Sequence, residues 1–255
     1  MSTSFFYRPA PPLSHFVATI WHYEGYTQPH ALERLMPDGA MAMVVNLDED
    51  AIRLYDRETH ACVSSLRGTV ITGAHDEFFI IDTAEQRCVL GVQFWPGGAY
   101  PFIDMPADQL RGEHFVIEGS LRERIIEART PLARCRTMEA ALLERARGRL
   151  ELRPDIAAAV ASMEHGGRVP DISKRFTERF RSTVGLTPKT YARVRRFQTT
   201  LRRIAQPGDI DWADIALACG YYDQAHFNHD FRAFSGINPS TYLAKKTPHL
   251  NHVPI

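Results

Sequence analysis

Polar side chains that suit contacts with base edges stand between Gly220 and Tyr242 (GYYDQAHFNHDFRAFSGINPSTY). Three phenylalanines at helical spacing, Phe227, Phe231 and Phe234, predict the buried face of one helix. The residues on its other faces are Gln224, Ala225, Asn228, His229 and Arg232. Gln, Asn and His can bond base edges, and Arg can bind phosphate. The segment therefore predicts either a helix directed at nucleic acid or a surface helix that is merely polar.

The residues before this segment predict a partner helix for it. Apolar residues at helical spacing indicate a helix over Asp211–Cys219, and Gly220 suits its C-terminal cap. Asp223 is a suitable N-cap for the next helix, Gln224–Phe234. Together these elements predict a helix–turn–helix unit.

An earlier copy of the same pattern lies 51 residues upstream. Phe176–Tyr191 and Phe227–Tyr242 are identical at seven positions, which include both phenylalanines, the glycine and the proline. Each copy predicts a helix buried through Phe, a Gly stop and a new helix that begins at Pro. The first copy gives a second candidate recognition helix, Ser173–Thr183, with a long helix Pro188–Ile204 between the two units. Its outward-facing residues are Lys174, Arg175, Glu178 and Arg181.

The first unit lacks a normal partner helix. The same offset aligns residues 163–170 (MEHGGRVP) with the helix of the second unit, and two glycines and a proline do not suit a helix. Either this helix is missing, or Asp155–Met163 takes its place across a longer turn. We expect the first unit to supply mainly non-specific affinity, while the second reads sequence.

The net charge of zero conceals an uneven distribution. Residues 1–164 hold 16 basic and 23 acidic side chains, whereas residues 165–255 hold 14 basic and 7 acidic side chains. This distribution predicts an acidic partner for the C-terminal part, with nucleic acid as the leading candidate. The alternative is that the two parts pair with each other.

The first hundred residues predict a β-rich domain. Short runs of β-branched and aromatic residues, separated by turn signals, occur at Ala40–Leu47, Ala51–Tyr55, Thr69–Thr72, Phe78–Asp82 and Cys88–Phe94. Apolar residues three and four apart then indicate helices at Ser120–Ala128 and Pro131–Leu150. We therefore expect an α+β chain of two domains. Residues 1–150 form a cupin-like barrel or sandwich with strands to about 95 and helices over 105–150, and residues 151–255 form an all-α double helix–turn–helix whose first unit is atypical or incomplete.

The C-terminal pattern resembles the AraC/XylS family of bacterial transcription regulators. The matching residues are Asp214-Ile-Ala-Leu-Ala-Cys-Gly220, Asp223-Gln-Ala-His-Phe227, Phe231-Arg232 and Gly236-x-x-Pro239-x-x-Tyr242. The resemblance implies two recognition helices that enter successive major grooves, about 34 Å apart on one face of the duplex. It also implies base contacts from Gln224, Asn228 and His229.

The N-terminal part resembles the β-rich sensor domains that precede AraC-type DNA-binding domains. The residues that carry this likeness include Tyr7-Arg-Pro-x-Pro-Pro-Leu13, Leu35-Met-Pro-Asp-Gly39 and Gly91-Val-Gln-Phe-Trp-Pro-Gly-Gly-Ala-Tyr100. Such domains bind a small effector, dimerise, or both. The residues that we expect to line an effector pocket, or else to form the barrel core, are Trp21, Phe94, Trp95 and Tyr100.

Several other function classes have no support in the sequence. The histidines show no ligand pattern, and His249 and His252 lie in a Pro-containing tail that we expect to be mobile. No nucleophile motif, phosphate loop, apolar membrane span or signal peptide is present, so we expect no enzyme activity, metal or cofactor. The four scattered cysteines indicate reduced thiols and a cytoplasmic location.

The sequence thus predicts a transcription regulator that binds a double-stranded DNA operator and responds to a small-molecule effector. A homodimer is a further expectation, as is contact with RNA polymerase if the protein is an activator. The alternative is an effector-binding or protein-interaction regulator whose specific DNA binding is weak or lost because its first unit is incomplete.

Overall fold

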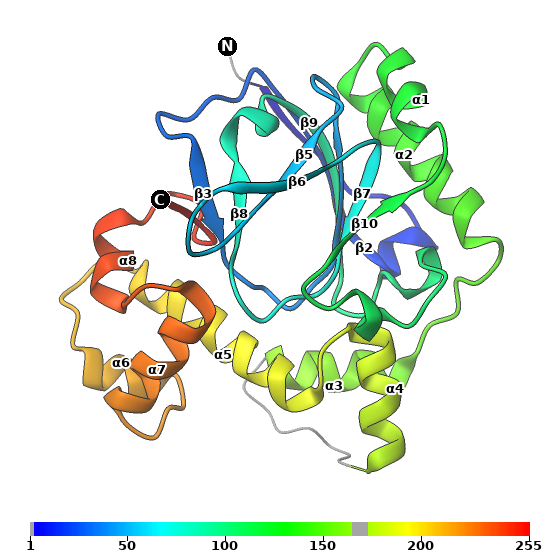
Figure 1. The fold of residues 1–255 in the computed structure, drawn as a ribbon. Coiled ribbons are helices and arrows are strands. Elements are labelled where there is room, and N and C mark those ends of the chain that lie inside the picture. Colours follow the sequence, from blue (N-terminus) through cyan, green and yellow to red (C-terminus); the bar gives the residue numbers. More distant parts are fainter. Residues whose placement is uncertain (1–2, 165–172) are drawn as a thin grey trace.

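A barrel-like body of antiparallel sheets forms the N-terminal half of the computed structural model, which describes residues 3–164 and 173–255 (Figure 1). Its strands are β1 (Thr3–Tyr7), β2 (Val17–Glu24), β3 (Leu32–Leu35), β4 (Ala42–Asn46), β5 (Ile52–Tyr55), β6 (Cys62–Leu66), β7 (Thr69–Thr72), β8 (Phe79–Asp82), β9 (Cys88–Phe94) and β10 (His114–Ile117). Its short 3₁₀ helices are η1 (Leu13–His15), η2 (Thr83–Gln86), η3 (Tyr100–Phe102) and η4 (Ala107–Leu110). This N-terminal body confirms the predicted β-rich fold.

The largest sheet has the strand order β1-β2-β9-β4-β7-β10. Side chains alternate between the two faces of a strand, so each face collects every second residue. One face carries fully buried aliphatic residues such as Ile20, Val45 and Leu90. Helices α1 (Leu121–Glu127) and α2 (Pro131–Ala146) lie on the outside of this sheet (Figure 1). The other face looks into the barrel.

Two smaller sheets close the barrel. The first has the order β11-β3-β8, in which β11 (His252–Pro254) comes from the C-terminal end of the chain, and the second is the β5-β6 hairpin. The tail was expected to be mobile, and this prediction was wrong. Val253 pairs with Arg34 of β3 and is fully buried, so the tail gains backbone hydrogen bonds and apolar contacts that tertiary structure alone supplies.

The expected strands agree with the structure most closely in the sheet centre, where β7 and β9 have the predicted bounds. The region expected to hold only helices, residues 105–150, also contains β10. This strand of four residues forms antiparallel pairs with β7, from His114 with Thr72 to Ile117 with Thr69. The prediction failed because so short a run acquires its conformation from a partner that is distant in sequence.

The C-terminal region is helical, as predicted. Its helices are α3 (Pro154–Glu164), α4 (Lys174–Val184), α5 (Pro188–Ile204), α6 (Trp212–Ala218), α7 (Gln224–Ser235) and α8 (Pro239–Lys245). Helix α5 has 17 residues and joins α4 to the α6–α7 pair, as Figure 1 shows. At about 1.5 Å per residue it is roughly 26 Å long. None of the described helices has both the length and the apolar character needed to cross a bilayer.

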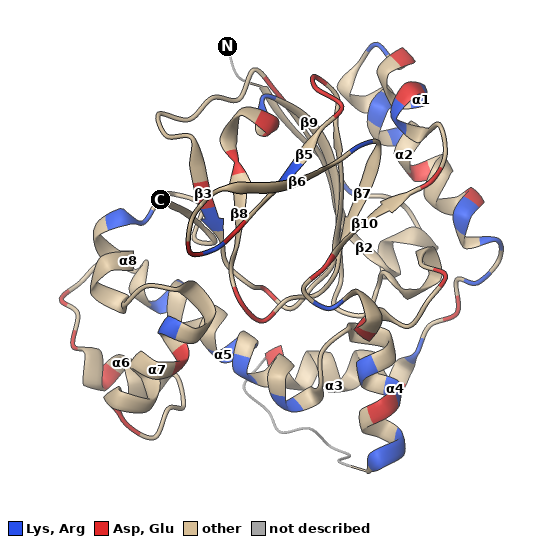
Figure 2. Cartoon of the chain, in the orientation of Figure 1, with Lys and Arg blue, Asp and Glu red and all other residues tan. Residues whose placement is uncertain are grey.

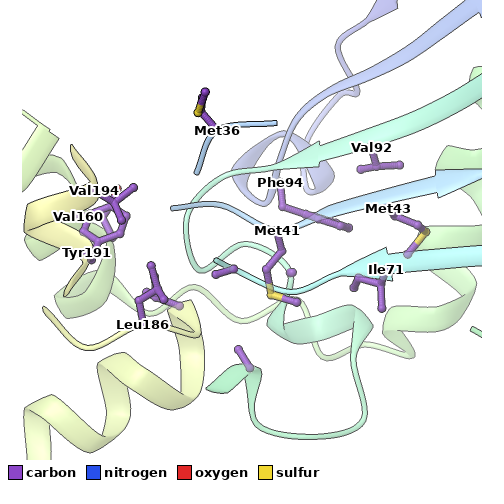
Figure 3. Packing of buried hydrophobic residues seen from close by; sticks show 14 of the residues in the cluster. Met36, Met41, Met43, Ile71, Val92, Phe94, Val160, Leu186, Tyr191 and Val194 are labelled. Atoms are coloured by element: carbon purple, nitrogen blue, oxygen red, sulfur yellow. The ribbon is translucent and has the colours of Figure 1, made fainter. Parts of the chain in front are cut away.

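The helical region and the N-terminal body share one continuous hydrophobic core. Figure 3 shows Leu186, Tyr191 and Val194 of the helical region beside Met36 and Met41 of the body. Gly39, with φ near +82°, lies so close to the Tyr191 ring that a Cβ there would stand 2.8 Å from it. The helical region is therefore packed directly against the barrel.

Candidate nucleic-acid interface and ligand cavity

Local hydrogen bonds fix the α6–α7 pair as a helix–turn–helix unit. Asp211 caps α6 by accepting hydrogen bonds from the amides of Ala213 (2.8 Å) and Asp214 (3.2 Å). Gly220 takes φ +79° in the turn, a conformation that favours glycine. Asp223 then caps α7 by accepting from the His226 amide at 2.7 Å. These caps determine the direction in which α7 leaves the turn.

Helix α7 exposes the residues that the sequence predicts to contact DNA. Phe227, Phe231 and Phe234 are buried. The predicted contact residues Gln224, Ala225, Asn228, His229 and Arg232 are all exposed. Four of them, all except Ala225, line one groove together with Trp212 and the start of α8. The structure thus brings these side chains onto one solvent-facing surface.

Asp230, which was not among the residues predicted from the sequence, fixes the position of α7 relative to α5. Its side chain is only 3% exposed, and Arg193 of α5 donates to Oδ1 at 2.7 Å. This pair holds the pKa of the Arg193 guanidinium above its ordinary value, with the Asp230 hydrogen bond as the main cause. Asp230 therefore ties α7 to α5. The sequence offered one signal for this role, since Asp230 is an acidic residue between the buried Phe227 and Phe231 in a largely basic region.

The predicted contact residues of α4 are exposed but have different partners. Lys174 is 91% exposed and lies 4.0 Å from Glu178. Arg175 is also exposed. Arg181 forms an ion pair at 2.9 Å with Asp108 of η4, in the N-terminal body. The C-terminal part of α4 is therefore in contact with the N-terminal body, whereas its first turn is exposed to solvent.

Helix α3 is the element that accompanies α4. Asp155 of α3 pairs with Arg179 of α4, and Arg153 donates to Thr183. The predicted helix Asp155–Met163 is confirmed as part of α3. The Gly- and Pro-containing stretch after it, Gly166–Pro170, lies outside the described residues. These contacts agree with the alternative in which α3 serves as the partner helix of α4.

Basic residues are distributed along α4 and α5, as Figure 2 shows. The Arg195 side chain is not free to contact a partner, because it donates to the Asp38 carbonyl at 3.1 Å and lies 3.5 Å from Glu164. Part of the positive charge of the helical region therefore pairs with acidic and carbonyl groups of the same chain, and another part faces solvent.

A cavity of about 540 Å³ lies inside the barrel, which is within the range of small-molecule sites. The inner face of the large sheet forms one wall, β3, β8 and the β5 strand form others, and the last wall comes from the helical region. That last wall consists of Gln198 and Arg202 of α5 and of residues 249–252.

Cross-strand pairing arranges the sheet wall in two rows. One row runs from Trp21 through Gly91, Val44 and Val70, and it is apolar. The indole of Trp21 lies against Gly91, where a Cβ would overlap it.

The neighbouring row is polar. It pairs Gln93 with Ala42, Ala42 with Thr72, and Thr72 with His114. Gln93 Nε2 donates to Asp38 Oδ2 at 3.1 Å, and His114 Nδ1 lies 3.1 Å from Thr72 Oγ1. The cavity wall therefore changes from apolar to polar along one direction.

Only one of the four residues predicted for the effector pocket lines this cavity, namely Trp21. Phe94 is buried on the opposite face of β9 and stacks on Phe102. Trp95 follows the end of the strand, is 49% exposed and donates to the Ser14 carbonyl. Tyr100 lies in η3 beneath the Arg153 guanidinium. Phe94 therefore agrees with the alternative of a core residue, and neither Trp95 nor Tyr100 lines this cavity, because aromatic character alone does not reveal which face of a strand is inward.

Burial shifts the pKa values of three cavity residues, His114, His75 and Glu85, in the direction that favours their neutral forms. Burial, with the nearby His75 as a smaller cause, lowers the pKa of His114 to about 4. Burial also lowers the pKa of His75, whose Nδ1 lies 3.3 Å from the Gly73 carbonyl. Burial raises the pKa of Glu85 to about 7. Arg53 of β5, which also lines the cavity, forms ion pairs with Glu49 (2.6 Å) and Glu85 (3.2 Å).

Hydrogen bonds connect the cavity to the helical region. Gln198 of α5 donates to the Pro37 carbonyl at 2.7 Å and to Asn251 Oδ1 at 2.9 Å. Next to the cavity residue Phe79, the amide of Phe78 donates to the carbonyl of Phe234, at the end of α7, at 2.8 Å. The cavity wall is thus bonded to both α5 and α7.

The C-terminal segment is held by a buried carboxylate. Glu33 of β3 is 1% exposed, and it lies 2.8 Å from His252 Nδ1 and 2.6 Å from His30 Nε2. Burial is the largest single influence on Glu33 and would raise its pKa, but the contacts with His252 and His30 together hold that pKa below its ordinary value. Across residues 3–164 and 173–255, no group of three or more His, Cys, Asp or Glu side chains is arranged to hold a metal ion.

Two family models match the chain. Residues 6–116 match a domain of unknown function, DUF6597, and residues 173–245 match a helix–turn–helix domain. No curated protein matches the chain.

Solved structures of ToxT from Vibrio cholerae are similar to it. An apo variant from strain SCE256 is 12% identical, with 91% of this chain and 98% of that chain covered and a TM-score of 0.46. A second ToxT structure is 9% identical, with 95% and 98% covered and a TM-score of 0.44. Wild-type ToxT with an unsaturated fatty acid bound is 9% identical, with 88% and 93% covered and a TM-score of 0.42.

Proposed function

We propose that this chain, whose residues 173–245 are an AraC-type helix–turn–helix domain, is a transcription regulator that reads its operator mainly through α7 and is controlled from the barrel cavity. One observation carries the DNA-reading part of the proposal. The α6–α7 unit presents Gln224, Asn228, His229 and Arg232 together on one exposed groove, within the matched domain. Amide and imidazole groups on such a helix can bond base edges, while the guanidinium binds phosphate.

Helix α4 supports a second, less specific contact. Its exposed N-terminal turn carries Lys174 and Arg175, which are suited to phosphate oxygens. Helix α5 separates the two units by roughly 26 Å, a length compatible with two units that approach neighbouring turns of one duplex face. In this proposal the first unit adds affinity, and the second unit supplies sequence preference.

The cavity supports control by a small molecule. Its walls include Gln198 and Arg202 of α5, the helix that links the two DNA-binding units. A ligand between the sheets would therefore contact both the N-terminal body and the helical region. Through Gln198 and through the Phe78–Phe234 hydrogen bond, a change in the cavity can alter the positions of α5 and α7.

Selection of bound duplexes from a random library with the full-length protein provides the operator for the test. We then expect Asn228→Ala to weaken operator binding by about 1–3 kcal/mol and to relax sequence preference at one position. Lys174→Ala should weaken binding to every sequence equally and reduce the salt dependence by about one phosphate contact. Both effects are measured by gel-shift titration at several salt concentrations.

Arg87→Ala is the matched control, because Arg87 pairs with Asp48 on the N-terminal body. It should leave the DNA affinity unchanged. If the library yields no enriched sequence, the chain does not read DNA by itself. That result would favour the alternative of a regulator that acts through its ligand or through another protein.

A further inference from the structure

We propose that the barrel cavity takes an uncharged ligand that has an apolar body and a hydroxyl group. The inference rests on the proposed function in one respect, since it treats this cavity as the effector site. It adds the chemical class of the effector, which neither the fold nor the helix–turn–helix domain specifies.

The apolar row defines where the body of the ligand lies. Val44 and Val70 are branched residues that leave space in front of the sheet, whereas the Trp21 indole fills the space in front of Gly91. Ile81 of β8 lines the opposite side, and Phe79 of the same strand packs edge-on against His75 and His114. A ligand between these walls exchanges water for apolar contact on two faces, which favours a flat or elongated hydrocarbon body.

The polar row defines where the hydroxyl group lies. Gln93 of β9, Thr72 of β7 and His114 of β10 form a row beside the apolar row, two residues further along the strands, in which paired residues on neighbouring strands are about 5 Å apart. Gln93 uses its amide group as a donor to Asp38, which leaves its Oε1 as an acceptor. The His114 ring bonds Thr72 through Nδ1, so its Nε2 is available to a ligand. A hydroxyl group both donates and accepts, so it can bond the His114 end of this row with either imidazole tautomer.

The charges in the barrel argue against an anionic ligand. Arg53 is already paired with Glu49 and Glu85. The imidazoles of His75 and His114 are neutral near pH 7, because burial lowers the pKa of both. Asp38 lies at the end of the polar row, where it would repel a carboxylate. An anion among the barrel strands would therefore lose its hydration without gaining a counter-charge from the sheets, and the cation left in the lining is Arg202 of α5.

A cationic ligand also lacks a free partner. Asp38 accepts hydrogen bonds from Gln93 and the Ala40 amide, and Asp82 accepts from Tyr55 and the Ala84 amide. Glu85 accepts from both the amide and the guanidinium of Arg53. Each carboxylate of the wall is thus already engaged. The remaining charged group, Arg202, lies on α5 and bonds Thr199 of its own helix, outside the barrel strands.

His75 lies in the cavity wall and, within the described part of the chain, carries one more polar atom without a partner. The carbonyl of Gly73 can only accept, so the contact at 3.3 Å places the proton of neutral His75 on Nδ1. Nε2 is then an acceptor, and it is buried without a partner among the described residues. This nitrogen has almost no accessible surface, so it is not presented to a ligand in the cavity.

Four probes with the same body separate the possibilities: 4-phenylphenol, biphenyl, biphenyl-4-carboxylate and 4-(aminomethyl)biphenyl. Binding to the full-length protein at pH 7.5 is measured by calorimetry and by quenching of Trp21 fluorescence in a Trp95→Phe/Trp212→Phe background. We expect 4-phenylphenol to bind at least tenfold more tightly than either charged probe and severalfold more tightly than biphenyl. The saturated analogue 4-cyclohexylcyclohexanol then distinguishes a phenol from an aliphatic alcohol as the preferred source of the hydroxyl.

Two variants locate the site. Val44→Phe fills the apolar row and should abolish probe binding, whereas Val63→Phe, on the 66% exposed Val63 of β6, should not. His114→Leu should remove the preference for 4-phenylphenol over biphenyl while biphenyl binding persists. Retained thermal unfolding and circular dichroism show that each variant is folded.

Three results would overturn the proposal. Tighter binding of the carboxylate, lost in Arg202→Ala, would make the site an anion site on α5. Tighter binding of the ammonium probe would show that a wall carboxylate is free. Absence of binding by all four probes would show that the cavity does not accept such a body. None of these results affects operator selection, so failure of the ligand class is distinguishable from failure of the proposed function.

Discussion

The side chains of Trp21 and Phe94 illustrate what a single residue reveals in a sequence. Both were expected either to line a pocket or to belong to the core, and only Trp21 faces the cavity, because β9 places Gly91 and Gln93 inward and Phe94 outward. Alternation itself is predictable from the strand period. Which of the two faces is covered by helices depends on distant segments, so the inward face was not predictable from local pattern.

His114 gives the cavity a pH-dependent contribution to stability. Its folded-state pKa of about 4 lies below the ordinary value of 6.5, so the unfolded state binds a proton more readily. The stabilisation is fully present above pH 6.5 and is lost as the pH falls through 4. The shift corresponds to about 3 kcal/mol.

Chemical denaturation of the wild type and of His114→Gln, measured from pH 7.5 to pH 4, tests this expectation. The glutamine keeps a hydrogen-bonding group beside Thr72 but does not titrate. The free energy of unfolding should fall more steeply for the wild type than for the variant. Parallel curves would show that His114 is not held neutral by its surroundings.

Helices with clear start and stop residues were predicted most accurately. Helix α5 runs over Pro188–Ile204 as expected, because Thr187 caps it and Pro188 suits its first turn. Strands without such local signals, including β10 and β11, were missed. Their conformation depends on hydrogen bonds to β7 and β3, which the local sequence does not encode.

Strand β11 attaches the end of the helical region to the barrel, and Val253 is its buried residue. We expect Val253→Asp to lower the free energy of unfolding by about 2–4 kcal/mol, because a carboxylate would replace an apolar contact. Since residues 249–252 line the cavity, ligand-probe binding should weaken as well. Denaturant unfolding and calorimetry measure the two effects.

Val63→Asp is the control for this change, since Val63 is exposed on β6. Its stability should remain within about 0.5 kcal/mol of the wild type. If Val253→Asp is equally mild, the C-terminal strand contributes little to the attachment of the helical region.

At the scale of the whole molecule, the sequence predicted the order of the parts but not their contacts. The repeat indicated two DNA-binding units, and the charge distribution indicated a basic C-terminal part. The docking of Tyr191 against Gly39 and the cavity wall formed by Gln198 join residues more than 150 positions apart. Such packing arises from the complementary shapes of two folded surfaces, which no local pattern specifies.

The ion pair between Asp108 and Arg181 connects this docking to DNA binding. Arg181 is one of the predicted phosphate contacts of α4, and Asp108 of the N-terminal body engages it at 2.9 Å. Because the arginine is about half exposed, the pair is worth about 0.5–1 kcal/mol. Asp108→Asn releases the guanidinium, so we expect DNA binding to tighten by roughly two- to fivefold for all sequences.

The salt dependence of DNA binding decides between a released phosphate contact and a simple change in net charge. If Arg181 moves onto a phosphate, the slope of log affinity against log salt should steepen by about one counterion. Asp104→Asn is the matched control, since Asp104 pairs with Arg145 and Arg149 within the N-terminal body and also removes one negative charge. Equal tightening in both variants would mean that overall charge is responsible. Tightening in Asp108→Asn alone would show that the barrel restrains α4 through this one contact.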